Sequence, residues 1–460
     1  MESRQDKRNK YFFGLGTIGR DMFYTMVSMF LVYYLTDILN LPDATYALVG
    51  TVFTVLRIFD AFNDPIMGMV VDNTKSKWGK FKPWLLVGGV VGAVLMVLLF
   101  TDLGLSGGWY ILVFALCYLG WDIFYGLNDI AYWSMMPTLS TNQKEREKIG
   151  SFARICANIG LFAVVVGILP ATNALGGIFG NLKTGWFVFA LIVVAVMIGF
   201  MCFTVFGVKE RKGYFKQEEQ TSVKDMFRAI FKNDQLLWVA ISMALFMVGY
   251  TTTTSFGTYF FKYAYRDENM YSMFALVLGV SQLVALTVFP LFSKKFSRRK
   301  LYTGATLLVL LGYIIFFFSP MNMLPIGIAG ILLFVGQAFI QLLMLMFLAD
   351  TIEYGQWKFG KRNDSVTFSV QPFINKIGGA LANGILTFTL IVSGINSAEV
   401  PTDVSDSGIF IMKIAMMAVP MIAIVVGYIV YLKKFKIDET MYGKIMDDLK
   451  ERGDIHTEAE

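Results

Sequence analysis

Two aspartates one helical turn apart, Asp60 and Asp64, lie deep in an apolar stretch of the chain. The residues around them, 49–56 and 66–71, are largely apolar, so we interpret the stretch as a membrane-spanning helix. Positions i and i+4 share one helical face, and an ionised carboxylate inside a bilayer is costly. Like charges on one face also repel, and binding of a proton or another cation relieves that repulsion. The pair therefore predicts the coupling-cation site of a transporter.

Few other ionisable residues fall within apolar runs. Those of the N-terminal half are Arg20, Asp21, Arg57, Asp122, Asp129 and Arg154. The C-terminal half offers one deep cation, Lys376. Because the deep carboxylates all belong to the first half, we expect cation coupling there and a closing contact from the second half. The alternative is that these charges only pair and hold helices together, for example Arg20 with Asp21 or Arg57 with Asp60.

Asp129 and Trp133 also lie one turn apart, on one face of a predicted helix. A carboxylate accepts hydrogen bonds from hydroxyl groups, and an aromatic ring stacks on the C–H face of a sugar. The pair therefore favours a carbohydrate ligand, and Asp21, Arg154 and Lys376 would suit the same polyhydroxylated molecule. Trp133 alone also fits an aromatic residue of the membrane interface.

The composition indicates a membrane protein with many spans. Of 460 residues, 56% are hydrophobic and only 16% charged, with a mean hydropathy of +0.58, whereas soluble domains carry roughly 25% charged residues. The single histidine, His456, lies in the polar C-terminal tail, which excludes a histidine relay or triad within the membrane. We find no nucleophile–base or phosphate-loop motif, so an enzyme or a receptor is disfavoured.

Twelve apolar runs are long enough to cross a bilayer. They fall near residues 11–37, 44–71, 83–101, 109–136, 150–172, 185–207, 236–261, 272–293, 301–319, 324–349, 366–394 and 410–432. We predict an all-α membrane protein with two six-helix bundles and a ligand site at their interface. The predicted parts are an N-terminal bundle (1–207, with the cation site and most of the sugar site), a central loop (208–235), a C-terminal bundle (236–432) and a tail (433–460).

Lysine and arginine distribution predicts the orientation. If the N-terminus is cytoplasmic, the outer loops carry only Lys183, Lys262 and Arg266, and all other loop cations lie inside. Both termini are then cytoplasmic, and the net charge of +6 reflects the membrane surface and requires no nucleic-acid partner. Residues 441–449 of the tail could form an amphipathic helix, but a solvated end is the favoured interpretation.

Several segments together resemble the glycoside–pentoside–hexuronide:cation symporters, the branch of the major facilitator superfamily that contains the melibiose carrier. The resemblance spans essentially the whole chain. The segments that carry it are Arg57–Trp84, Gly19–Asp21, Asn128–Ser134, Lys144–Glu147 followed by Arg154, Asp350–Lys358 and Ser369–Lys376. It implies the twelve-helix fold of the superfamily and a multi-pass protein of the cell membrane, which we expect to be a bacterial inner membrane.

The resemblance also implies residue roles. Sugar binding falls to Asp21, Asp129 and Trp133, with Arg154 and Lys376 nearby. Cation binding falls to Asp60 and Asp64, with Asn63 and Asp129 adjacent; Asp60 and Asp64 would be the metal ligands if the cation is Na⁺.

The segment that follows the cation site resembles the cytoplasmic gate motif of the superfamily, whose charges latch the two bundles in one state. Its residues here are Gly68, Asp72, Lys77, Gly79 and Lys80. Without the family, the lysines are equally well explained as ordinary positively charged residues of an inner loop.

Two departures from the family bear on the coupling ion. Sodium-using relatives carry a hydroxyl side chain three residues before the helix IV aspartate, where this chain has Gly126, and this chain adds Asp122. Na⁺ needs several oxygen ligands, whereas a proton needs one carboxylate of raised pKa, so both departures favour H⁺ over Na⁺.

We therefore expect a secondary active transporter, not an enzyme, that imports a glycoside (a di- or oligosaccharide, pentoside or hexuronide) in symport with H⁺ or Na⁺ by alternating access, with no cofactor. The alternative is a uniporter or exchanger of the same fold, in which the aspartates are structural.

Overall fold

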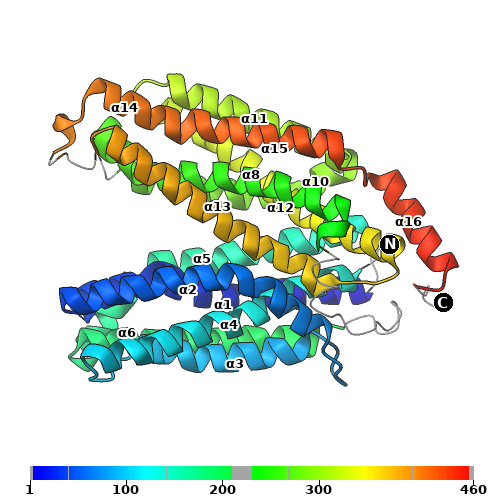
Figure 1. The fold of residues 1–460 in the computed structure, drawn as a ribbon, viewed down its shortest axis with the longest axis horizontal. Helices are drawn as coiled ribbons and strands as arrows, with labels where there is room; N and C mark the ends of the chain where they lie inside the picture. The colour runs from blue at the N-terminus through cyan, green and yellow to red at the C-terminus, as the bar shows by residue number, and fades with distance from the viewer. Residues whose placement is uncertain are drawn as a thin grey trace. The chain divides into compact units, whose positions relative to one another are not determined.

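The computed structural model describes residues 4–39, 41–140, 142–209, 230–267, 270–395, 398 and 400–454. Within these ranges the chain is helical and contains no strand (Figure 1). Among the described residues, ten helices are long and apolar enough to cross a membrane, and α1 and α2, which carry more charge, are two further long helices. The predicted all-α class is confirmed.

Each predicted span corresponds to a helix or to a helix continued by a short π-helical turn. The N-terminal half contains α1 (Arg4–Tyr33), α2 (Asp43–Asp72), α3 (Lys82–Leu99), α4 (Gly107–Leu139), α5 (Gln143–Phe179) and α6 (Leu182–Gly207). The C-terminal half contains α8 (Asp234–Ser255), α9 (Gly257–Tyr259), α10 (Met270–Lys295), α11 (Arg298–Phe318), α12 (Met323–Phe359), α13 (Asp364–Val392), α14 (Asp406–Lys413), α15 (Val419–Lys434) and α16 (Glu439–Glu451).

Polar caps determine where several of these helices begin. An asparagine side chain accepts a hydrogen bond from a backbone N–H of the first turn in four of them: Asn142 in α5, Asn181 in α6, Asn233 in α8 and Asn322 in α12. Such a cap satisfies a donor that the helix itself leaves unpaired. At the other end, Gly180 and Gly360 stop α5 and α12 in the left-handed conformation, at φ 71° each.

The helices form two compact units. The first comprises Met1–Met226, Asn363–Ser369 and Asp454–Glu460, and the second comprises Phe227–Arg362 and Val370–Gly453. In the first unit α1 packs on α5 and α6, and α3 packs on α4; in the second, α12 packs on α10 and α11, and α8 packs on α15. The predicted central loop, 208–235, lies largely outside the described residues, and its bounds stay a prediction. Residues 363–369, which the sequence assigns to the second bundle, cluster with the first unit.

The C-terminal segment is not a solvated end. Helix α16 buries one face, formed by Tyr442, Ile445, Met446 and Leu449, and it packs on α12. The Trp357 indole N–H donates to Asp448 over 2.7 Å. The favoured prediction for residues 441–449 was therefore wrong, because the apolar residues recur at helical spacing and find a partner surface on α12.

Close approach of α1 and α5 depends on a glycine. A Cβ added at Gly160 of α5 would clash with the backbone carbonyl oxygen of Ile18, so no side chain fits there. Small residues that let backbones approach are typical of membrane helix interfaces. Gly167, two turns further along α5, has nothing within 4 Å of the same position.

We predict opposite effects of alanine at these two glycines. Gly160→Ala should lower the free energy of unfolding by about 1–3 kcal/mol, because the clash is with backbone that can move only with its helix. Gly167→Ala should leave the thermal midpoint of the purified protein unchanged or raise it, since alanine is the better helix former. Equal midpoints for the two variants, measured by heating followed by size-exclusion chromatography, would contradict the packing.

Candidate functional site

A buried arginine organises the first unit. Arg20 of α1 is only 2% exposed, and its guanidinium forms an ion pair with the Asp129 carboxylate of α4. Its Nε donates to Asn128 Oδ1 over 2.9 Å, and Asn128 Nδ2 donates in turn to the carbonyl of Leu85 over 2.8 Å. Three helices, α1, α3 and α4, are therefore joined through one cation.

Aromatic rings support the same guanidinium. Arg20 lies over the ring of Tyr132, with its Cζ 4.1 Å from the ring centroid. Tyr132 stacks on Phe13 at 4.2 Å between centroids, and its hydroxyl donates to the carbonyl of Phe13. A cation over an aromatic face is stabilised further when water is excluded, so the position of Arg20 is held on two sides.

Arg154 and Asp21 complete a group of four charges. The Arg154 guanidinium lies over the indole of Trp133, 4.5 Å from the ring centroid. Asp21 interacts electrostatically with Arg20, Arg154 and Asp129. Two carboxylates and two guanidiniums sum to zero, which lowers the cost of placing all four among apolar helices.

Some guanidinium N–H donors of this group form no hydrogen bond to the described residues. Among the described residues, Arg154 Nε and Arg20 Nη1 are buried with no hydrogen-bond acceptor. A buried donor without an acceptor is costly, and a ligand rich in hydroxyl oxygens would satisfy both. The group thus has the chemistry of a site for a neutral, polyhydroxylated molecule.

The structure brings four of the five predicted sugar-binding residues into one unit: Asp21, Asp129, Trp133 and Arg154. Lys376 lies on α13 in the second unit and is half-buried. Trp133 is only 8% exposed, and Arg154 covers one face of its ring. The indole therefore positions Arg154 in this conformation, a role beyond the predicted stacking on a sugar.

Asn63 and Asp64, two of the predicted cation-binding residues, are buried on α2, at 6% and 3% exposure. Helix α2 packs on α4, which carries Asp129. The side chain of Asp60 lies outside the part of the chain that the structure describes, so the proposed pairing of Asp60 with Asp64 stays a prediction. Pro65 lies inside α2, and its missing N–H leaves the carbonyl of residue 61 without its usual helical donor.

Three members of the site were not predicted from the sequence: Arg20 as the partner of Asp129, Asn128 as an acceptor, and Tyr132 as the ring beneath the guanidinium. All three stand beside predicted residues, within Gly19–Asp21 and Asn128–Ser134. The signal was therefore present in the motifs. Which neighbour faces which helix could not be read without the packing.

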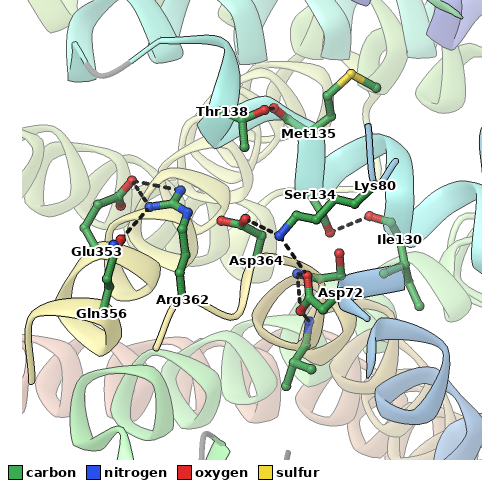
Figure 2. Close-up of polar contacts among 12 residues, drawn as sticks. Asp72, Lys80, Ile130, Ser134, Met135, Thr138, Glu353, Gln356, Arg362 and Asp364 are labelled. Carbon is green, nitrogen blue, oxygen red and sulfur yellow. Dashed lines mark hydrogen bonds and ion pairs between the residues drawn. The ribbon is translucent and has the colours of Figure 1, made fainter. Parts of the chain in front are cut away.

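The predicted gate motif holds the first turn of α13 (Figure 2). Asp72 accepts hydrogen bonds from the backbone N–H groups of Ser365 and Val366, over 3.0 and 2.9 Å. Lys80 Nζ lies between two carboxylates, 2.8 Å from Asp364 and 3.2 Å from Asp72. A carboxylate at a helix N-terminus is favoured by the unpaired N–H groups and the helix dipole.

Two glycines of the motif are required for different structural reasons. Gly79 adopts φ 98°, in the region that favours glycine, and so turns the chain that presents Lys80. A Cβ at Gly68 would lie 2.6 Å from the carbonyl oxygen of Ser365, so α2 approaches the start of α13 closely. Lys77, the remaining residue of the predicted gate, is exposed.

The second unit contains a comparable polar cluster near the end of α12. Arg362 donates to Glu353 and Gln356, over 3.3 and 3.2 Å, and all three side chains are buried (Figure 2). Arg298 and Asp350 form a second buried ion pair. Glu353 and Asp350 belong to the segment Asp350–Lys358, which carries part of the family resemblance.

The profile of the family described as MFS/sugar transport protein matches residues 12–439. The chain belongs to this family. It is 33% identical to the raffinose carrier protein of Pediococcus pentosaceus over 95% of this chain and 70% of the relative. It is 32% identical to the lactose permease of Lactobacillus delbrueckii subsp. bulgaricus (95% and 72% covered) and 28% identical to the isoprimeverose transporter of Lactiplantibacillus pentosus (84% and 80% covered).

Solved structures show the same fold. The Escherichia coli fucose:proton symporter superposes with a TM-score of 0.66 at 13% identity, covering 92% of this chain and 99% of that one. A proton:xylose symporter superposes with a TM-score of 0.60 at 14% identity, covering 95% and 97%. The resemblance to glycoside–cation symporters and the major facilitator fold are thereby confirmed. This chain is therefore a multi-pass sugar transporter of the cell membrane and not an enzyme.

The Arg20–Asp129 pair makes a prediction for stability. Arg20→Gln should lower the free energy of unfolding by about 3 kcal/mol, the low end for a broken buried pair because Asp129 is 26% exposed. Arg20→Gln combined with Asp129→Asn should recover much of that loss, since neither charge is then left alone. A double variant no more stable than Arg20→Gln, by thermal midpoint, would show that the pair is not the stabilising interaction.

The gate motif makes a second prediction. Lys80→Gln should cost about 2 kcal/mol, less than a fully buried pair because Lys80 is 22% exposed, and leave two carboxylates without their cation. Lys75→Gln, which removes the same charge from an exposed position in the same loop, is the matched control. Comparable midpoints for the two variants in thermal unfolding would refute the role assigned to Lys80.

Proposed function

We propose that this protein imports a di- or oligosaccharide or another glycoside together with a cation, by alternating access. The group of Arg20, Asp21, Asp129 and Arg154 is the observation that carries the sugar site. It is neutral as a whole, rich in directed hydrogen-bond groups and supplied with unsatisfied guanidinium donors. Relatives named for raffinose, lactose and isoprimeverose support a ligand of this class.

The cation site is proposed on α2, at Asp60, Asn63 and Asp64, with Asp129 adjacent. Asp64 is 3% exposed, and a carboxylate so deeply buried is favoured to bind a proton or a cation. The carbonyl of residue 61, freed by Pro65, adds an oxygen to the same turn. Cation binding at α2 would raise sugar affinity, and by linkage the sugar would raise cation affinity by the same factor.

We favour H⁺ as the coupling ion over Na⁺. Gly126 contributes no side-chain oxygen, and the space beside its Cα is open, with nothing within 4 Å of an added Cβ. An Na⁺ site would therefore lack one neutral ligand on α4, whereas a proton needs only the carboxylate. Asp122, an additional acid on α4, adds a second group that could carry a proton.

The test uses proteoliposomes with imposed gradients. Vesicles holding the purified protein are given a pH gradient, an Na⁺ gradient or none, and uptake of labelled raffinose, lactose and a glucuronide is measured. Accumulation driven by the pH gradient alone supports H⁺ symport, and accumulation driven by Na⁺ alone reverses the choice of ion. Uptake that equilibrates without accumulating under either gradient indicates the uniporter or exchanger.

Asp64→Asn should abolish gradient-driven accumulation, because the amide cannot exchange a proton or balance a cation. Sugar exchange across the membrane should persist if the fold is intact, which a thermal midpoint near that of the unmodified protein would establish. Asp102→Asn is the matched control, since Asp102 is an exposed acid that pairs with Lys183 over 2.7 Å, away from α2. Concentrative uptake retained in Asp64→Asn would rule out the assigned cation site.

A further inference from the structure

Two adjoining hollows lie on the first unit, outside the charge group and outside the gate contacts of Lys80. The larger, of about 560 Å³, is formed where the α2–α3 connection meets the end of α6. Its cations are Lys77, Lys82 and Lys209, and its apolar wall includes Trp78, Val205 and Phe206. Among the described residues that line it, the charged side chains are these three lysines.

The positively charged rim is held in place by backbone contacts. Lys82 Nζ donates to the carbonyl of Val208 over 2.8 Å. Asn9 of α1 exchanges two hydrogen bonds with the backbone of Lys209, at 3.0 and 2.9 Å. These contacts from α1 and α3 therefore fix the end of α6 and the position of Lys209, the first lysine after it.

The second hollow, of about 360 Å³, continues from the first across Phe206. It runs over an apolar face of α1 and α6, with Phe12 and Phe203 in its walls and Arg8 at its rim. Arg8 Nε donates to the carbonyl of Gly207 over 2.8 Å, which keeps this fourth cation beside the same ridge. Phe206 is 68% exposed and Phe203 50% exposed on this face.

The end of α6 carries cations, and exposed aromatic side chains follow along the same helix. This combination matches a phospholipid. A phosphodiester head group would neutralise the cations, and an acyl chain would cover Phe203 and Phe206. Clusters of lysine and arginine that flank membrane helices attract anionic lipids in this way, and Trp78 is the type of residue that prefers the head-group level. A soluble anion would leave the apolar half of the surface unused.

We propose that this surface of the first unit is a binding site for an anionic phospholipid of the leaflet that faces the basic loops. Lys77, Lys82 and Lys209 bind the phosphate, Arg8 stands beside it, and one acyl chain lies along the Phe203–Phe206 side of α6. The site lies apart from the sugar and cation residues, so it neither requires nor repeats the proposed transport function.

The test compares lipid retention by native mass spectrometry of the full-length protein. Phosphatidylglycerol and phosphatidylcholine with identical acyl chains are supplied in equal amounts to the detergent-purified protein. We expect phosphatidylglycerol to be retained preferentially, and the preference to fall by up to about thirtyfold in Lys77→Gln/Lys209→Gln, about fivefold for each lysine removed. Lys294→Gln/Lys295→Gln, which removes two exposed charges at the end of α10 in the second unit, should retain the preference of the unmodified protein.

A second variant tests the acyl-chain half without altering charge. Phe206→Ser should weaken retention of both lipids, and it changes an exposed residue that contributes little to the core. Equal losses in the two double-lysine variants would overturn the proposal, because charge alone would then explain retention. Undiminished retention in Phe206→Ser, or full competition by inorganic phosphate, would overturn it in favour of a site for a soluble anion.

Discussion

The structure of the first unit depends on the neutralisation of Arg20. A guanidinium that is 2% exposed among apolar helices is stable only if nearby groups neutralise its charge and accept hydrogen bonds from its N–H groups. Asp129 supplies the opposite charge, Asn128 an acceptor and Tyr132 an aromatic face. Because these groups come from α4 while Arg20 comes from α1, satisfying one cation also fixes how two helices meet.

The same constraint explains why the group can bind a ligand. Once Arg20 and Asp129 neutralise one another, Asp21 and Arg154 remain as a second pair of opposite charges, and Arg154 Nε has no acceptor among the described residues. Because the four charges sum to zero, placing them together costs little electrostatic free energy. Guanidinium donors of the group nevertheless lack an acceptor among the described residues. In the proposed mechanism a hydroxyl-rich substrate makes those bonds, and the energy gained is coupled to the occupancy of the acids on α2.

The gate motif shows the same physics at a helix end. Asp72 and Asp364 are both almost fully buried, and the excess negative charge is balanced by Lys80 and by the N-terminus of α13. The motif was predicted from the family resemblance as a set of charges, with ordinary loop lysines as the alternative. The contacts give distinct tasks to Asp72, Gly79 and Lys80, whereas Lys77 is exposed and lines the basic hollow.

The sequence by itself determined the helices and which residues carry charge inside them. Hydropathy is a local property, so the long apolar helices and the motifs Gly19–Asp21 and Asn128–Ser134 could be predicted directly. Only the tertiary structure decided the partner of each charge. Neighbours such as Arg20 and Asp21 point in different directions on a helix, so Arg20 reaches across to Asp129. The packing of α16 on α12 was also decided by the tertiary structure, because an amphipathic pattern predicts which face of a helix is apolar but not which surface packs against it.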